Sequence, residues 1–330
     1  MTNDFTTPAI EIEALTKEYR QGKTTVQAVK NLHLTVPTGQ VFGFLGANGA
    51  GKTTTIKMIC GLITPTTGSI RINGYDVMRA RSMAMRQIGV VLEGTRNIYW
   101  RLTAWENLMY FGRLKGCPHR QIVTHARLLL QELDLWERRN DPVRLFSRGM
   151  QQKVAIACSL IADPAIILLD EPTLGLDFQA AQTVKAWIAK LVSERGKTVI
   201  LTTHQLDMAQ DLCHRIAIMR KGSLLANQPL SELLHLFRHE HYQIKVQGLL
   251  TERGADWCAG FNIEAEDGVT TISGIIDDDS ALYELLAHLK RLRFPLLAVE
   301  RVEPSLEEVF VHLLEEKKEE QHEKHLVSHL

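Results

Sequence analysis

The stretch Gly46-Ala47-Asn48-Gly49-Ala50-Gly51-Lys52-Thr53 decides how this chain folds. The apolar run Val41–Leu45 precedes it and predicts a buried strand, and residues 54–61 follow it with helical periodicity and a glycine where a helix would end. Glycines let successive backbone N–H groups point inward around a phosphate, and the positive end of the next helix adds to the attraction. We therefore predict that this stretch holds a phosphate group.

The last two residues of the stretch have the chemistry that a nucleoside triphosphate and its metal require. Lys52 is placed to reach the β- and γ-phosphates, and the hydroxyl of Thr53 is placed to ligate Mg²⁺. Strand, glycine loop, Lys-Thr and helix together form the context of a P-loop, so a glycine-rich turn with a chance lysine is the weaker alternative.

Composition predicts a globular protein with one large domain, or one medium and one small domain. The chain has 330 residues, of which 45% are hydrophobic, and a formal net charge of zero. The charge is uneven, with an excess of +10 in residues 1–230 and of −10 in residues 231–330. A basic nucleotide-binding domain followed by an acidic appendage fits this asymmetry. A positive face would also favour an anionic membrane surface, and ordinary scatter of surface charge is an equal alternative.

Cysteine usage and the N-terminus bear on the compartment. The cysteines are scattered, odd in number and without a CxxC pair, so we expect free thiols in a reducing compartment. Residues 1–4 lack the basic and apolar regions of a signal peptide, and no apolar stretch reaches the roughly 18 residues of a spanning helix. We expect a cytoplasmic protein that meets a membrane only through a partner. The five cysteines are Cys60, Cys117, Cys158, Cys213 and Cys258.

Strands and helices alternate along most of the chain. Residues 8–38 alternate between apolar and polar and predict a group of antiparallel strands. Later strands separated by helices predict a largely parallel, doubly wound sheet. Residues 94–160 show helical patterns instead, with a capping box at Thr103–Glu106, and predict an inserted helical subdomain. The later predicted strands are residues 88–92, 165–169, 198–203 and 215–219.

Polar side chains follow the predicted strands where each strand ends, which is where ligands bind in such sheets. Asp170 can hold Mg²⁺, while Glu171, one residue on, points elsewhere and can polarise an attacking water. Glu93 and His204 end two other strands, and His204 could contact the γ-phosphate. The alternatives are an acidic pair that caps a helix and a structural histidine. Tyr19, expected between two of the first strands, could stack on adenine or be a half-buried strand tyrosine.

The last hundred residues predict a separate small domain of two α/β halves, which is typical of a ferredoxin-like fold. Its charged tail from residue 313 to 330 is helical in propensity and expected to be partly disordered at its end. Histidines 322, 325 and 329 could bind a metal, although a solvated tail is the stronger interpretation. The predicted elements are strands at 242–246, 261–264, 269–273 and 296–302, and helices at 251–258 and 279–291.

In this order, the motifs resemble the ATP-binding subunit of an ABC transporter over residues 8–230. The signature motif separates this family from other P-loop ATPases, and its counterpart is Leu145–Gln152, before a predicted helix. No Asn-Lys-x-Asp guanine motif is present, which argues against a GTPase. The other matches are Gly46–Thr54 with Walker A, Ile166–Glu171 with Walker B and its catalytic glutamate, Thr173–Asp177 with the D-loop, Thr203-His204 with the switch histidine, and Tyr19 with the adenine-stacking aromatic.

The resemblance implies an α/β fold: a P-loop NTPase core with an antiparallel β subdomain and an inserted helical subdomain, plus a small α+β C-terminal domain. The implied ATP-binding domain is residues 8–230, with the helical subdomain at about 94–160. Residues 231–310 form the accessory domain, and residues 311–330 form a charged helical or disordered tail.

The resemblance also implies the function. The chain would hydrolyse ATP and energise a separate membrane permease for export, with ATP between the Walker A loop of one protomer and the signature motif of the other. ATP and Mg²⁺ are the implied cofactors. The implied partners are a polytopic permease and a second ATPase subunit, identical or related, with no nucleic acid, at the inner face of the cell membrane. Glu171 and His204 are implied as catalytic, Thr53, Glu93 and Asp170 as metal-binding, and Tyr19, Gly46, Ala47, Asn48, Gly49, Ala50, Gly51, Lys52, Thr53, Thr54, Ser147, Gly149 and Gln151 as ATP-binding.

Two residues depart from the family pattern. Arg148 stands where the signature has a glycine, and a bulky cation there can tighten or hinder phosphate contact. Glu93 stands where the family has glutamine. Glutamate keeps an oxygen for Mg²⁺ but adds charge and loses the N–H donor, which bears on the hydrolysis rate.

Other segments bear on partners. Residues 94–103 match the region where such subunits meet the permease, and exposed Tyr99 and Trp100 with Arg96 and Arg101 would suit an interface, the alternative being that both aromatics are core. Pro304–Phe310 resembles the ending of exporter subunits. A soluble ABC ATPase on ribosomes or DNA is an alternative, although such proteins usually carry two cassettes or a coiled coil. A regulatory subunit with weak hydrolysis is another.

Overall fold

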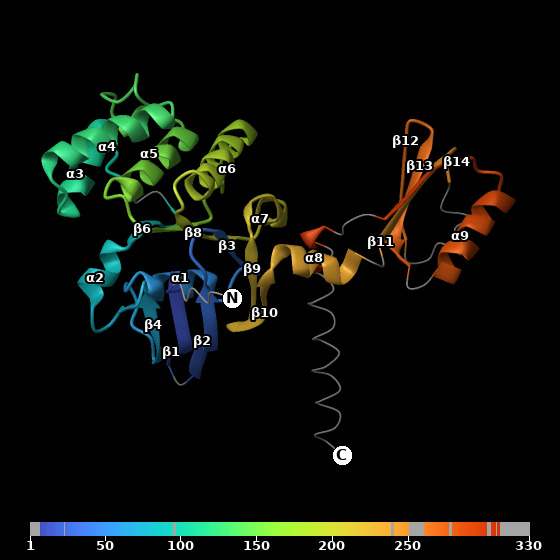
Figure 1. The fold of residues 1–330 in the computed structure, drawn as a ribbon, viewed down its shortest axis with the longest axis horizontal. Coiled ribbons are helices and arrows are strands. Elements are labelled where there is room, and N and C mark those ends of the chain that lie inside the picture. The colour runs from blue at the N-terminus through green and yellow to red at the C-terminus, as the bar shows by residue number, and fades with distance from the viewer. Residues whose placement is uncertain are drawn as a thin grey trace, which may run out of the picture. The chain divides into compact units, whose positions relative to one another are not determined.

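The computed structural model describes residues 7–22, 24–94, 97–238, 241–250, 261–276, 279–301, 305–307 and 309–310. The chain divides into two compact units, Met1–Pro229 and Leu230–Leu330 (Figure 1). The first unit carries two sheets and a group of helices, and the second carries a sheet of its own.

The first sheet of the N-terminal unit is antiparallel, as predicted for residues 8–38. Its strands lie in the order β2-β1-β4-β5. Tyr19 lies inside β1, paired with Val26, and not between two strands as expected. The bounds are β1 (Ile10–Gln21), β2 (Thr24–Val36), β4 (Thr67–Ile72) and β5 (Tyr75–Asp76).

The second sheet of this unit is the predicted parallel sheet, in the order β10-β9-β3-β8-β7-β6. Only the edge strand β10 runs antiparallel, against β9. The sequence analysis missed β10, because its apolar run is only Leu224–Ala226 and its residues are half-buried, unlike the longer, fully buried runs of the inner strands. The bounds are β3 (Val41–Leu45), β6 (Ile88–Val91), β7 (Ile166–Asp170), β8 (Thr198–Thr203), β9 (Arg215–Arg220) and β10 (Ser223–Pro229).

The predicted helical subdomain consists of three helices that pack on one another, and Figure 1 shows them grouped beyond one end of the parallel sheet. They are α3 (Ala104–Leu114), α4 (His119–Glu132) and α5 (Arg148–Leu160), with a 3₁₀ turn at Val143–Leu145. The predicted capping box begins α3, because Thr103 and Glu106 each bond the other's backbone N–H. The remaining helices are α1 (Lys52–Ile59), α2 (Arg81–Arg86), α6 (Phe178–Ser193) and α7 (Leu206–Leu212).

A close approach fixes α5 against the parallel sheet. A Cβ on Gly89 in β6 would overlap the carbonyl oxygen of Ser159 in α5, so this contact requires glycine. Strands β3 and β7 are buried at every position, so the residues that follow their carboxyl ends are carried by the core of the parallel sheet. No helix within the described ranges is long and apolar enough to cross a membrane.

The four described cysteines are free thiols, as predicted. Cys60, Cys158 and Cys213 are buried, and Cys117 is half-buried. Burial raises the pKa of the Cys60 and Cys213 thiols to about 12, so both stay protonated and unreactive at neutral pH. Cys258 lies outside the described residues.

The second unit has a four-stranded antiparallel sheet in the order β12-β13-β11-β14. Counted along the chain this is the order 2-3-1-4 with α9 before the last strand, as in the predicted ferredoxin-like fold. The predicted helix at 251–258 and the tail histidines lie outside the described residues. The elements are α8 (Leu230–Arg238), which was not predicted, β11 (His241–Gln247), β12 (Asn262–Glu266), β13 (Val269–Ile275), α9 (Asp279–Arg291) and β14 (Leu296–Arg301).

We predict that Leu168→Ala lowers the free energy of unfolding of the N-terminal unit by about 2–5 kcal/mol, because Leu168 is fully buried in β7 and its loss leaves a cavity. Urea unfolding followed by circular dichroism measures this. Leu128→Ala, at a position that is 50% exposed in α4, is the matched control and should change stability by less than about 0.5 kcal/mol. Equal effects of the two variants would contradict the assignment of β7 to the core.

Candidate active site

Glycines shape the loop between β3 and α1. Gly46, Gly49 and Gly51 have φ values of 150°, 80° and 106°, which favour glycine. A Cβ on Gly51 would also lie only 2.6 Å from the carbonyl oxygen of Ala28. The loop therefore has the curvature predicted for a phosphate-binding loop, and it leads into the N-terminus of α1.

Lys52 is folded back into this loop. Its Nζ donates to the carbonyl oxygens of Gly46, at 2.5 Å, and Ala47, at 3.3 Å. The side chain is buried, and desolvation lowers the pKa of Lys52 although the carboxylates of Glu171, Asp170 and Glu93 act in the opposite direction. The buried ammonium thus lacks a full counter-charge, which a phosphate would supply.

Asp170 ends β7 beside the same loop. Its Oδ1 accepts a hydrogen bond from the hydroxyl of Thr202 and lies 3.5 Å from Oγ1 of Thr53. Its Oδ2 is buried and has no hydrogen-bond partner among the described residues. A buried carboxylate oxygen without a partner is costly, and an oxygen-seeking divalent cation would satisfy it. The residues present therefore fit Mg²⁺.

Glu171 follows at once but points elsewhere, as predicted. Its φ of 50° is left-handed, and its backbone N–H donates to the carbonyl oxygen of Thr202 at 3.1 Å. Its Oε1 lies 2.8 Å from Nδ1 of His204, the residue after β8. The two carboxylates at the end of β7 thus have different partners, which allows them different chemical roles.

The signature segment leads into the N-terminus of α5, and its residues cap and pack that end of the helix. The hydroxyl of Ser147 accepts from the backbone N–H of Met150 at 3.3 Å and caps the helix. A Cβ on Gly149 would lie 2.7 Å from Cβ of Ala180 in α6, so glycine permits this packing. Nε2 of Gln151 donates to the carbonyl oxygen of Phe146 at 3.1 Å, and within one protomer this residue holds the turn together.

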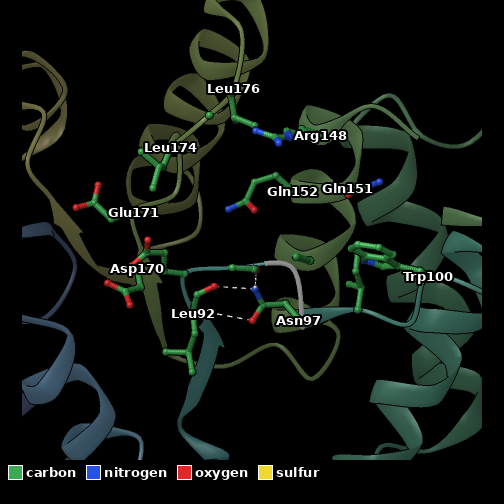
Figure 2. A pocket seen from close by; sticks show the side chains of 15 residues that line it. Leu92, Asn97, Trp100, Arg148, Gln151, Gln152, Asp170, Glu171, Leu174 and Leu176 are labelled. Atoms are coloured by element: carbon green, nitrogen blue, oxygen red, sulfur yellow. Dashed lines mark hydrogen bonds between the residues drawn. The ribbon is translucent and has the colours of Figure 1, made fainter. Parts of the chain in front are cut away.

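A cavity of about 530 Å³ brings three predicted segments together (Figure 2). Glu93 lines it from the end of β6, Asp170 and Glu171 from β7, and Arg148 and Gln151 from α5. The glycine loop does not line this cavity, and neither does Tyr19. Tyr19 is 37% exposed on β1, with Nζ of Lys17 5.1 Å from its ring centroid.

Two positioning residues escaped the sequence analysis. Thr202, fully buried near the end of β8, bonds both Asp170 and Glu171. The amide of Asn97 donates to the carbonyl oxygens of Leu92 and Gly94 and so fixes the segment that carries Glu93 (Figure 2). A polar residue inside an apolar strand was the one available signal for Thr202, whereas Asn97 gave none.

Comparison with known proteins decides the family. A family described as ABC transporter matches residues 29–174. The linearmycin resistance ATP-binding protein LnrL of Bacillus subtilis (strain 168) is 32% identical to this chain over 92% of it and 97% of the relative. The chain belongs to the family of ABC transporter ATP-binding proteins. The daunorubicin/doxorubicin resistance ATP-binding protein DrrA of Streptomyces peucetius is 33% identical over 94% of both chains.

Solved structures agree with this assignment. A dimeric ATP-binding cassette in a post-hydrolysis state, bound to ADP and phosphate, superposes with a TM-score of 0.61 at 29% identity, over 67% of this chain and 98% of that one. Residues 241–300 match a family described as a domain of unknown function. The predicted family, fold class and ATPase activity of this ABC ATPase are confirmed.

We predict that Lys52→Met leaves the ATP-free protein at least as stable as the parent but removes its stabilisation by ATP. The variant loses a buried ammonium whose lowered pKa marks a desolvation cost, and it also loses the charge that meets the phosphates. At an ATP concentration 100 times Kd, the parent should gain about 2.7 kcal/mol. Unfolding with and without ATP measures both effects.

Lys57→Met, in the same helix, is the control and should keep the full ATP effect. Stabilisation of Lys52→Met by ATP to the parent's extent would contradict the place of Lys52 in the site.

Proposed function

We propose that this ABC ATPase hydrolyses Mg-ATP to energise a separate membrane permease for export. The observation that carries the hydrolytic part is the buried oxygen of Asp170 next to Thr53, which has no hydrogen-bond partner in the described part of the chain, with Glu171 directed to His204. Export is supported by the similarity to LnrL and DrrA, both named for drug resistance, over nearly the whole chain.

The site residues divide the reaction among them. Lys52 and the loop amides bind the β- and γ-phosphates, and Thr53, Asp170 and Glu93 supply oxygens to the metal. Mg²⁺ supplies charge neutralisation on the phosphates when it is bound. Glu171 accepts the proton of the attacking water, and His204 holds the carboxylate in place through its 2.8 Å bond. Tyr19 stacks on adenine from the surface of β1.

A second ATPase subunit completes the site in this proposal. The capped N-terminus of α5, with Ser147, Gly149 and Gln151, would cover the γ-phosphate held on the partner's loop. The solved cassette with ADP and phosphate is dimeric, which supports such an assembly. The chain has one glycine loop and one signature segment, so two copies or a related subunit are needed.

An aromatic surface provides the place for the permease. Tyr99 and Trp100 are 49% and 45% exposed, so the alternative that both are core residues is wrong. The Tyr99 ring packs edge-on to exposed Tyr110, with centroids 4.9 Å apart, and Arg101 is exposed beside them. Arg96 lies outside the described residues. Docking there would hold the chain at the inner face of the cell membrane.

Two alternatives are separable by experiment. A soluble ABC ATPase would co-purify with ribosomal RNA or DNA, whereas a transporter subunit would co-purify with a polytopic membrane protein. A regulatory subunit with weak hydrolysis rests on Glu93 and Arg148, both exposed at the cavity. A turnover measurement on the purified chain distinguishes that subunit from an active one.

We predict that Glu171→Gln slows ATP hydrolysis by about 10²–10⁴-fold and traps an ATP-bound dimer, because the amide cannot accept the proton of the water. Phosphate release and size-exclusion chromatography with ATP measure the two effects. Glu137→Gln, at an exposed site outside the cavity, is the control and should match the parent. Parent-like turnover of Glu171→Gln would refute the role of this carboxylate.

We predict that Trp100→Ala weakens binding to the permease by about 10-fold or more, since an exposed aromatic anchor typically contributes strongly to an interface. Recovery of the polytopic membrane protein with the tagged chain measures this. Tyr75→Ala, an exposed aromatic on the antiparallel sheet, is the control. Unchanged recovery with Trp100→Ala would exclude this surface.

A further inference from the structure

Arg148 connects two segments whose roles differ in the proposed dimer. It is the first residue of α5, next to the capping Ser147, and it is exposed. A Cβ on Gly175 would lie 3.3 Å from Nη1 of Arg148, so the guanidinium lies against the backbone of the D-loop at Thr173–Asp177. Figure 2 shows the side chain reaching toward Leu176.

The D-loop is connected in turn to the catalytic carboxylate of its own chain. The backbone N–H of Leu174 donates to the carbonyl oxygen of Glu171 at 3.2 Å. The hydroxyl of Thr173 donates to Oε1 of Gln205 at 2.8 Å, and Gln205 directly follows His204, which bonds Glu171. A shift at Gly175 therefore reaches Glu171 through two short hydrogen-bonded paths.

The guanidinium of Arg148 is not committed to an ion pair. Among the described residues, no carboxylate lies within 4.0 Å of it. Arginine presents planar N–H donors that match phosphate oxygens. Because no ion pair holds the guanidinium at the D-loop among the described residues, it is able to move from Gly175 to a phosphate. A glycine at this position has no side chain that could make either contact.

We propose that Arg148 is a positioning residue that couples the two ATP sites of the dimer. When ATP on the partner's loop meets the signature segment, the guanidinium exchanges its contact with Gly175 for the γ-phosphate. The released D-loop then changes the placement of Glu171 at its own site, so that ATP bound at one site promotes hydrolysis at the other. The inference rests on the proposed dimer, in which each signature segment covers the partner's nucleotide.

The test is the ATP dependence of hydrolysis by the full chain. The parent should show a Hill coefficient well above 1, with 2 as the limit for two sites. Arg148→Ala should bring the coefficient close to 1, and Arg148→Lys should restore part of it. Affinity of the monomer for a fluorescent ATP analogue should stay within about twofold, because Arg148 does not touch the loop of its own chain.

Gly175→Ala perturbs the contact from its other side, because the added methyl would crowd Nη1 of Arg148 at 3.3 Å and alanine is strained at the φ of 74° that Gly175 adopts, and the Hill coefficient should fall likewise. Arg120→Ala removes an equal charge from an exposed position in α4 and is the matched control, expected to keep the parent's coefficient. Thermal unfolding confirms that each variant is folded.

The outcomes separate this inference from the proposed function. If Glu171→Gln forms the ATP-bound dimer but Arg148→Ala keeps the parent's Hill coefficient, the coupling role is overturned and the dimer stands. If Arg148→Ala abolishes that dimer in the Glu171→Gln background, Arg148 is a dimer contact and the coupling role is overturned as well. If Glu171→Gln forms no ATP-dependent dimer, both the dimer and the coupling fall.

Discussion

The active site depends on opposite charges that are buried at one edge of a sheet without neutralising each other. Lys52 rests on carbonyl oxygens, and its pKa is lowered by desolvation. Asp170 keeps one carboxylate oxygen buried without a partner among the described residues. Each group is unfavourable alone, and together they are complementary to a phosphate with a bound cation. The free protein holds these groups in place because the surrounding strands are buried at every position.

Close backbone packing also fixes the helical subdomain against the sheet that carries these charged groups. Gly149 lets α5 approach α6, and Gly89 lets β6 approach the other end of α5. The first contact lies beside the signature segment, and the second lies close to the segment that carries Glu93. The cavity between them is therefore bounded by elements with little freedom to shift independently, whereas the exposed side chains on its walls, Arg148 among them, can move.

The sequence predicted the parts of the site that depend on local chemistry. A glycine loop followed by Lys52 and an apolar strand ending in Asp170 and Glu171 each have a pattern within a few residues, as does the capping box at Thr103 outside the site. The parts that depend on tertiary contact could not be predicted. Thr202 bonds Asp170 across two paired strands, and Asn97 closes a loop that no periodicity marks. Strand β10 has an apolar run of only three residues, Leu224–Ala226, and is half-buried at the edge of the sheet.

The two glycine contacts of α5 also set how its length can vary. A single residue added between Gly149 and Ser159 would rotate one end of the helix by about 100° relative to the other and lengthen it by about 1.5 Å. Either Gly149 would turn away from Ala180 or Ser159 would turn away from Gly89. The number of residues in this helix is therefore fixed by geometry at both ends.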